Sequence, residues 1–366
     1  MDPKDFALLC LCSIPSVGPV TVRRLLSAFG GAQEIFAASE RMLRQVEGIS
    51  EKRSRAIREY NGADSLARTL EKLEAQDVHA VFQGKEGYPV ALDSLGDDAP
   101  LALYVRGHII EEDRFAVAIV GSRNASPYGR AVTGRIAADL GHMGLTVISG
   151  MARGIDTAAH RGVLESGGRT IGVLGSGIDV FYPAENRTLM EKTAAAGSAV
   201  ISEFPPGTKP LRENFPRRNR LISGLSLGVL VVEAAKRSGS LITAGFALEQ
   251  GRDVFAVPGN ISSSTSQGAN ELLRQGAKLV TGAEDILEEL APQLKGFLRA
   301  ACKPEEALDV NEEQRRLCEA MSGEPVHVDE ISRASGVPVP LALGLLLELE
   351  LKGVIKQMEG KRFYLS

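Results

Sequence analysis

Residues 116–123, Ala-Val-Ala-Ile-Val-Gly-Ser-Arg, decide the fold class of this chain. Five apolar residues run directly into a glycine, and the helix-length stretch 128–140 follows. A continuous apolar run of this length is typical of a strand buried on both faces of a parallel sheet. The turn Gly121-Ser122-Arg123 then puts small residues and one cation just before a helix, where ligands of such sheets bind.

The same pattern recurs along the central part of the chain. β-branched runs bounded by Gly, Pro or Ser lie at 145–149, 170–174, 199–202, 227–232 and 253–257. Most of them are separated by helix-length segments such as 241–250. Strands that alternate with helices form βαβ units. Residues 80–290 are therefore predicted to form an α/β domain with a doubly wound, mostly parallel sheet.

Smaller domains are predicted on both sides. Residues 1–75 read as helical, and Ser16-Val17-Gly18 and Gly48-Ile49-Ser50 each lead into a helix. This repeat suggests a degenerate pair of helix-hairpin-helix units, whose turns can offer backbone amides to a phosphate. A small packing bundle without a ligand is the alternative.

The C-terminal part follows a different pattern. Residues 291–307 contain Pro292 and Pro304 among mixed charges and are predicted to be a linker. Residues 308–366 read as helices followed by a two-stranded hairpin, which is typical of a winged helix. Its third helix, 339–351, carries two glutamates and no basic residue, so we expect a protein-interaction or regulatory module rather than a reader of duplex DNA.

Composition excludes several classes of protein. The 366 residues are 44% hydrophobic and 24% charged, which excludes a mostly disordered or fibrous chain. No window of 18 apolar residues predicts a membrane span, and the acidic N-terminus is not a secretory signal, so a cytoplasmic protein is expected. The four cysteines have no zinc spacing and are expected to be reduced.

Net charge does not by itself predict a nucleic-acid partner. The formal charge is −4, and residues 303–366, with eight basic and twelve acidic side chains, account for all of it. A local basic patch can still bind nucleic acid, because binding depends on where the charge lies.

Cofactor and catalytic motifs are missing from the sequence. Gly175-Ser176-Gly177-Ile178-Asp179-Val180 lacks the third glycine of a dinucleotide-binding fingerprint, and there is no P-loop. The five histidines form no metal-ligand set. Asp156 and His160 share a helix face, and we interpret them as a loop cap and a packed side chain. We therefore expect no cofactor, no metal and no catalytic residue.

Loops at the expected carboxyl ends of the strands could instead bind phosphates. Small residues next to helix starts let backbone amides approach an anion closely. The loops with this character are 121–123, 149–156, 175–177, 202–204, 238–240 and 258–260.

The strongest local feature is a basic run, 209–220, with five basic side chains and one acidic side chain. Phe215 within it could stack a base while the arginines hold phosphates. Lys236 and Arg237 precede the loop 238–240 and could add to the patch. The alternative is a solvated helix end whose arginines pair with Glu203, Glu213 or Glu233.

Several segments resemble the DprA/Smf family of DNA-processing proteins. They are Gly121–Arg123, the segment Ser-Gly-Met-Ala-Arg-Gly-Ile-Asp-Thr-Ala-Ala-His at 149–160, Phe-Pro-Arg-Arg-Asn-Arg at 215–220, Ser-Gly-Ser-Leu-Ile-Thr-Ala at 238–244, and Val-Pro-Gly at 257–259. The resemblance is dense over about residues 80–285, and it implies an extended Rossmann-like fold for this central domain. It implies sequence-independent binding of single-stranded DNA, loading of the RecA recombinase in DNA uptake, natural transformation and recombination, and a homodimer formed through the Rossmann-like domain. It implies neither an enzyme nor a membrane protein.

The residues and the resemblance together give a candidate DNA-binding set. Arg123 matches the arginine of the family's Gly-Ser-Arg segment, and the resemblance implies first of all that this residue contacts a phosphate. Arg212 stands where many family members have lysine. The set is Ser122, Arg123, Ser149, Gly150, Arg153, Lys209, Arg212, Phe215, Arg217, Asn219, Arg220, Lys236, Arg237, Ser238, Gly239 and Ser240. Two alternatives remain: an enzyme that binds a nucleotide phosphate with the same loops, and a pure protein-interaction scaffold.

Overall fold

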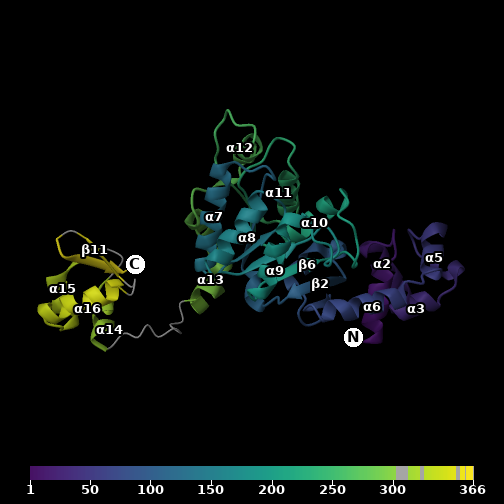
Figure 1. Cartoon of the computed structure of the whole chain (residues 1–366), viewed down its shortest axis with the longest axis horizontal. Coiled ribbons are helices and arrows are strands. Elements are labelled where there is room, and N and C mark those ends of the chain that lie inside the picture. The colour runs from purple at the N-terminus through teal and green to yellow at the C-terminus, as the bar shows by residue number, and fades with distance from the viewer. Residues whose placement is uncertain (302–311, 322–324, 352–354, 359, 366) are drawn as a thin grey trace. The chain divides into compact units, whose positions relative to one another are not determined.

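The computed structural model describes residues 1–301, 312–321, 325–351, 355–358 and 360–365. The chain forms two compact units, Met1–Leu298 and Arg299–Ser366. Each is described here by itself (Figure 1).

A nine-stranded sheet forms the centre of the first unit, in the order β1-β2-β6-β5-β4-β3-β7-β8-β9. The strands from β6 to β9 in this order run parallel, whereas β2 pairs antiparallel with both β1 and β6. The sequence identified the six strands from β3 to β8 and missed the others. The strands are β1 (Val78–Phe82), β2 (Ala102–Gly107), β3 (Ala116–Val120), β4 (Thr146–Ser149), β5 (Thr170–Val173), β6 (Ala199–Ser202), β7 (Gly228–Val231), β8 (Asp253–Ala256) and β9 (Lys278–Leu279).

The strand order changes direction at β3. From β3 the chain adds β4, β5 and β6 on one side, and then crosses to place β7, β8 and β9 on the other. This confirms the doubly wound, mostly parallel sheet. It also puts a topological switch point between β3 and β7, where open α/β sheets bind their ligands beyond the carboxyl ends of the strands.

Helices cover both faces of the sheet, and β3 shows why both faces are apolar. Ala116, Ala118 and Val120 belong to a core with α10 (Asn214–Gly224), α11 (Gly239–Glu249) and α12 (Gln267–Arg274). Val117 and Ile119 belong to the opposite core, with α7 (Pro127–His142), α8 (Ile155–Glu165) and α13 (Ala283–Ala301). Successive strand residues point to opposite faces, so a strand covered twice needs an unbroken apolar run.

Glycines let α7 and α8 pack against each other at backbone distance. A Cβ added at Gly162 on α8 would lie 2.4 Å from the carbonyl oxygen of Gly134 on α7. A Cβ added at Gly168, just beyond α8, would lie 2.7 Å from the Cα of Gly141. These two helices therefore form one rigid layer against β3 and β4.

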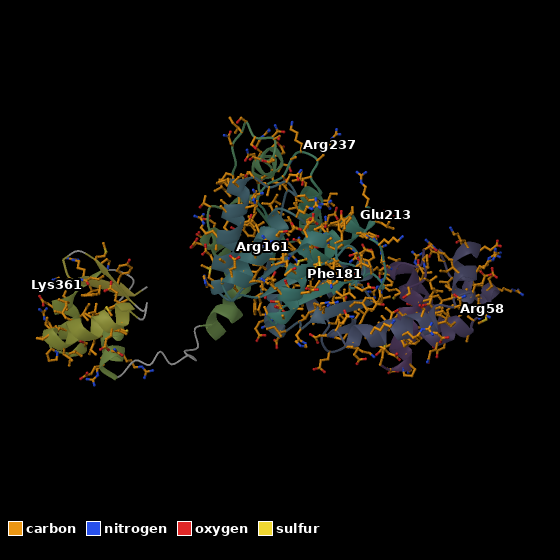
Figure 2. The ribbon with its side chains drawn as sticks, in the orientation of Figure 1. Arg58, Arg161, Phe181, Glu213, Arg237 and Lys361 are labelled. Atoms are coloured by element: carbon orange, nitrogen blue, oxygen red, sulfur yellow. The ribbon has the colours of Figure 1, made fainter. Side chains whose placement is uncertain are left out.

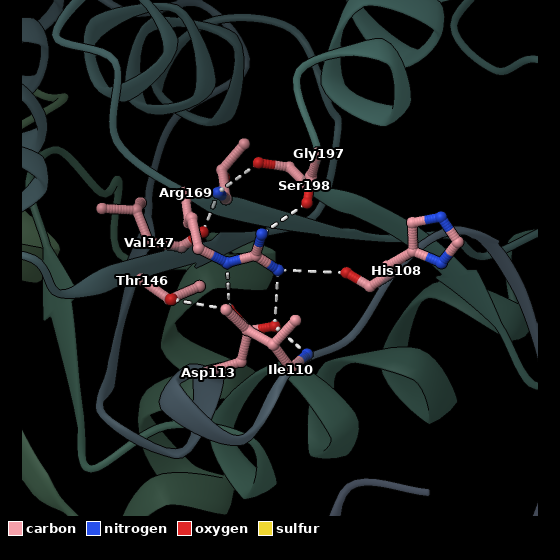
Figure 3. A network of polar contacts seen from close by, with 9 residues as sticks. His108, Ile110, Asp113, Thr146, Val147, Arg169, Gly197 and Ser198 are labelled. Atoms are coloured by element: carbon pink, nitrogen blue, oxygen red, sulfur yellow. Dashed lines mark hydrogen bonds and ion pairs between the residues drawn. The ribbon is translucent and has the colours of Figure 1, made fainter. Parts of the chain in front are cut away.

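A polar network closes the amino-terminal edge of the sheet (Figure 3). The guanidinium of Arg169 donates to both carboxylate oxygens of Asp113, at 2.9 and 2.8 Å, and to the carbonyls of His108 and Gly197. Asp113 also accepts from the Thr146 hydroxyl at 2.8 Å. The network links the segment before β3, the first residue of β4 and the segment before β5, so these parts of the amino-terminal edge are fixed to one another.

The N-terminal helices have their own core and also pack against β1 and β2. Arg53 joins their two related turns, since it donates to the carbonyl of Ser16 at 3.1 Å and to that of Gly48 at 2.6 Å. Both acceptors have positive φ, 69° and 82°. The helices are α1 (Pro3–Cys12), α2 (Pro19–Phe29), α3 (Ala32–Ala37), α4 (Glu40–Leu43), α5 (Glu51–Arg58) and α6 (Ala63–Glu74).

Four shorter elements complete the first unit. They are the 3₁₀ helices η1 (Val90–Asp98), η2 (Glu111–Arg114) and η3 (Ala184–Asn186), and the helix α9 (Arg187–Ala195), which packs beside β2, β5 and β6.

The second unit has the winged-helix arrangement that the sequence predicts. Its three strands lie in the order β10-β12-β11, and Ile331, Leu346 and Phe363 lie in its core. No single described helix is long and apolar enough to cross a membrane; α15 and α16, bent by 104°, pass that test only as a pair. The elements are α14 (Glu312–Glu319), β10 (Val326–His327), α15 (Val328–Ser335), α16 (Val339–Leu351), β11 (Ile355–Met358) and β12 (Arg362–Leu365).

The expected linker at 291–307 needs a correction. Helix α13 continues through Pro292 as far as Ala301. Leu290 and Leu294 are fully buried on either side of the proline, so the apolar face of the helix continues past it and stabilises the last turns. Residues 302–307 lie outside the described part of the chain.

Candidate nucleic-acid interface

A cleft of about 670 Å³ opens at the switch point, beyond the carboxyl ends of β3 and β7. Its walls come from the turn after β3, the loop before α10, the first turns of α10 and the start of α11. Residues that lie far apart in the sequence meet here because parallel strands end at the same edge. From the predicted set, the lining includes Arg123, Arg212, Phe215, Asn219, Arg237, Ser238, Gly239 and Ser240.

Arg123 and Phe215 form the centre of the cleft. The guanidinium carbon of Arg123 lies 5.1 Å from the centre of the Phe215 ring, within the range of a cation–π contact. The ring of Tyr182 lies 5.7 Å from that of Phe215, at an interplanar angle of 44°. A Cβ at Gly175 would lie 2.8 Å from the Phe215 ring, so the glycine lets the ring pack against the loop after β5.

Three cations around these rings have no acidic partner. Arg123, Arg212 and Arg237 are exposed, and no ion pair is found for them within the described residues. Figure 2 shows Arg237 extending from its loop into solvent. Exposed guanidinium groups keep their donors free for phosphate oxygens, which they can hold with two parallel hydrogen bonds.

The start of α11 adds backbone donors to the same wall. The hydroxyl of Ser238 caps the helix by accepting from the Ser240 amide at 3.3 Å. The positive end of the helix dipole therefore faces the cleft, next to Arg237. This combination favours an anion.

A buried arginine supports the cleft from below. Arg218 on α10 is 4% exposed and donates to the carbonyls of Gly150, at 2.8 Å, and Val173. Burial lowers its pKa to about 10, and nearby Asp156 opposes that shift, so the guanidinium stays charged near neutral pH. The side chain thereby joins the ends of β4 and β5.

Asp156 orients the neighbouring loop, as the sequence interpretation had it. Its Oδ2 accepts from the amides of Gly150, at 3.1 Å, and Ala152, at 3.2 Å. Burial raises the pKa of Asp156, and Arg218 and the two amides counter that effect.

His160 packs beneath this loop, which is also as expected. It is fully buried, and its Nδ1 lies 2.7 Å from the Thr170 hydroxyl. Burial is the main cause that lowers the pKa of His160 to about 3, so the ring is neutral. Within the described residues, no group of three His, Cys, Asp or Glu side chains could hold a metal ion.

Some predicted residues lie away from the cleft surface. The hydroxyl of Ser149 is buried and donates to the Ile119 carbonyl at 2.6 Å, so it serves the sheet. Arg220 is buried in an ion pair with Glu203, whose side chain is 4% exposed. For Arg220 the alternative of an ion pair with Glu203 is therefore correct, because α10 turns this side chain toward the loop after β6.

Other predicted residues lie near the cleft without lining it. Arg217 has its guanidinium carbon 5.2 Å from the centre of the Phe204 ring and faces a neighbouring cavity. Exposed Arg153 pairs with Glu185, and both side chains are more than half exposed. Gly150 and Arg153 line a small side pocket that shares Arg123 and Phe215 with the cleft. Ser122, Lys209 and Lys236 do not line the cleft, although each is next to a lining residue or close to one in sequence.

Sequence reasoning missed two kinds of cleft residue. Arg218 lay inside the basic run but was left out of the candidate set, because its buried bonds are invisible in sequence. Tyr182, Ile242 and Thr243 also line the cleft. Two adjacent aromatics at 181–182, in a loop after an expected strand, were a usable signal for Tyr182.

Comparisons with known families cover nearly all of this architecture. Residues 79–291 match the model of DNA recombination-mediator protein A. Residues 301–361 match the DprA winged-helix domain, and residues 8–60 match a SAM-like tandem of helix-hairpin-helix units.

Individual relatives agree with these models. Protein Smf of Escherichia coli K12 is 42% identical over 81% of this chain and 80% of its own length. The DNA processing protein DprA of Streptococcus pneumoniae is 46% identical over 55% of this chain and 71% of its own.

Two solved structures share the fold. DprA from Streptococcus pneumoniae aligns with a TM-score of 0.66 and 35% identity over 79% of this chain and 99% of that one. DNA processing protein A from Helicobacter pylori, solved to explain its single-stranded DNA binding mode, aligns with a TM-score of 0.52 and 29% identity over 59% of this chain and 96% of that one.

Proposed function

Since the chain belongs to the DprA/Smf family of DNA-processing proteins, we propose that it binds single-stranded DNA in the cleft at the β3–β7 switch point. The observation that carries this proposal is the group formed by Arg123, Phe215 and Tyr182, with Arg212 and Arg237 in the same cleft and without an ion pair in the described part of the chain. Aromatic faces and free cations side by side suit a polymer that alternates bases with phosphates.

The residue roles follow from the chemistry of each group. Arg123, Arg212 and Arg237 neutralise phosphates, and the amides at the start of α11 donate to a further phosphate oxygen. Phe215, supported by Tyr182, stacks one base. Stacking and phosphate contacts accept any base, so binding is largely independent of sequence.

The finer biological role comes from the family resemblance. We propose that the chain presents the bound strand to the RecA recombinase in DNA uptake and recombination, and that it works in the cytoplasm as a homodimer formed through the Rossmann-like domain. The winged helix then acts as a protein-interaction module. Its apolar helix α16 uses Glu348 and Glu350 within its own unit, where they accept from Gln314 and the Gln357 amide.

A small-molecule enzyme is the second candidate, because the cleft is large enough for a nucleotide. Three exposed arginines line the cleft, which argues against it, because one small ligand rarely needs so many cations. A nucleotide enzyme also needs a general acid–base pair. The carboxylate that lines the cleft, Asp156, instead accepts hydrogen bonds from two loop amides.

Fluorescence anisotropy with a labelled oligothymidine of about 30 nucleotides, beside a duplex of equal length, tests the proposal. Each phosphate neutralised on a single strand contributes about −0.7 to the log–log salt slope, so three cleft arginines predict a slope of about −2 or steeper. Absence of single-strand binding, together with thermal stabilisation by a mononucleotide, would favour the enzyme instead.

A further inference from the structure

A second basic surface lies outside the cleft, between α7 and α8. It is a groove of about 580 Å³. Five basic side chains and one acidic side chain line it: Arg123, Arg130, Arg135, His142 and Arg161 against Glu165. All six are exposed. The groove therefore carries a clear excess of positive charge in a chain whose net charge is −4.

The shape of the groove follows from the spacing of small residues on the two helices. Gly134 and Ala138 on α7 face Ala158 and Gly162 on α8, in rows spaced by four residues. Residues four apart share one side of a helix, so each row leaves a trough where the helices touch. Long basic side chains stand on both sides of that trough, and Figure 2 shows Arg161 on α8.

The groove begins where the cleft ends. Arg123 lines both, so one guanidinium lies at their junction. Helices α7 and α8 each follow a parallel strand, and both therefore start at the edge of the sheet that carries the cleft. The groove runs from this junction, past Arg130 and Arg161, toward His142 at the end of α7.

The basic residues of the groove keep donors available. Arg130 uses one nitrogen on the Ala125 carbonyl, at 2.6 Å, and Arg135 uses one on the Thr281 carbonyl, at 2.8 Å. A guanidinium has five N–H donors, so each retains several. Arg161 forms no ion pair within the described part of the chain. Unlike the cleft, the groove has no aromatic lining, so it is suited to phosphates and not to stacked bases.

We propose that the groove between α7 and α8 holds the sugar–phosphate backbone of the same single strand after it leaves the cleft at Arg123. This inference rests on the proposed function, because the strand must enter through the cleft. The DNA-binding surface would then have two parts. At Phe215 the protein stacks a base, and along α7 and α8 it contacts phosphates by electrostatic attraction alone.

Oligonucleotides of different length distinguish the cleft from the groove, because a short strand occupies the cleft alone and a long strand reaches both. Full-length protein is titrated with labelled oligothymidines of about 6 and about 25 nucleotides at several salt concentrations. The test variant is Arg161→Ala combined with Arg135→Ala. The matched control is Arg114→Ala, which removes an exposed arginine at the opposite edge of the sheet.

The groove variant should bind the short strand as the wild type does, within about twofold. It should bind the long strand at least tenfold more weakly, with a salt slope shallower by about 1.4, because two phosphate contacts are lost. Arg161→Lys combined with Arg135→Lys should restore most of the slope. Two results would contradict binding in the groove while leaving the cleft proposal intact. In the first, the groove variant loses the same affinity for both strand lengths. In the second, it loses affinity for neither length, whereas Arg123→Ala weakens the binding of both. A wild type that binds neither length would overturn both proposals.

Discussion

Arg123 and Phe215 are 92 residues apart in the sequence, and yet the guanidinium carbon lies 5.1 Å from the centre of the ring. Arg123 follows β3, and Phe215 lies in the first turn of α10. The contact aligns a cation and an aromatic face before any ligand arrives. Binding then spends little free energy on ordering these side chains.

The first expectation concerns Arg123. Arg123→Ala should weaken single-strand binding and make the salt slope shallower by about 0.7, because one phosphate contact is lost. Arg114 precedes the same strand and lies over Phe115 at 4.7 Å, so it is a closely matched control. Anisotropy should show no change for Arg114→Ala. Equal losses in the two variants would mean that general charge, not the cleft, holds the strand.

Phe215→Ala should weaken binding without altering the salt slope. A stacked base contributes about 1–3 kcal/mol, so we expect a loss of about 5-fold to 150-fold for every homopolymer tested. Phe215→Tyr keeps the ring and should retain binding. A changed salt slope in Phe215→Ala would show that the ring acts by positioning Arg123 instead.

Arg220→Ala should affect stability rather than DNA contacts. It leaves the carboxylate of Glu203 buried and unpaired, which costs about 3–5 kcal/mol of unfolding free energy. Burial already raises the pKa of Glu203, and loss of Arg220 raises it further. The carboxyl is protonated at low pH, so the deficit should be smallest near pH 4 and grow toward pH 7. Urea titrations of both proteins at several pH values measure this; a deficit independent of pH would contradict it.

The burial of His160 should make the free energy of unfolding decrease at acid pH. The folded protein keeps the ring neutral to a pKa of about 3, whereas the unfolded chain binds a proton near 6.5. Between these values the unfolded state holds the extra proton, so stability falls as pH falls, by up to about 1.4 kcal/mol per pH unit. In His160→Gln this contribution should disappear. The difference in unfolding free energy between variant and wild type would then shift with pH over this range, and a constant difference would argue against the mechanism.

Two glycines on facing helices should respond in opposite ways to the same substitution. Gly162→Ala puts a Cβ 2.4 Å from the Gly134 carbonyl and should destabilise the protein by about 1–3 kcal/mol. A Cβ at Gly134 meets nothing within 4 Å, so Gly134→Ala should stabilise α7 by about 0.5–1 kcal/mol. Thermal unfolding of the two variants gives the comparison. A loss of stability in Gly134→Ala as well would contradict the open space that the structure shows at this position.

The strands of the sheet could be predicted where both faces are covered, because double burial leaves a continuous apolar run such as 116–120. The edge pair β1 and β2 was missed. β1 includes exposed His79. β2 does contain an apolar run, 101–105, but no helix-length segment separates it from β3, so it falls outside the βαβ alternation. Pro292 wrongly suggested that a linker begins at 291, because the sequence could not show that Leu290 and Leu294 share one core.

The site was predictable as a region and not as a set of side chains. The basic run contains Arg217, Arg218 and Arg220, but consecutive helix positions differ by about 100° in direction. The helix therefore turns Arg218 beneath the cleft and Arg220 toward Glu203, while Arg217 stays exposed. The partners of these arginines lie on or next to other strands. The local sequence therefore could not distinguish an arginine that stabilises the site from one that is free to contact DNA.

The cations of the cleft stand on separate segments: Arg123 after β3, Arg212 before α10 and Arg237 before α11. A polymer held at separate points can lose one point while the others hold. A competing protein can then occupy each freed stretch before the polymer rebinds, so departure from the cleft would speed up as the competitor becomes more concentrated. Under the proposed function, a strand bound in this way would pass to the next protein by stepwise exchange, without first being released into solution.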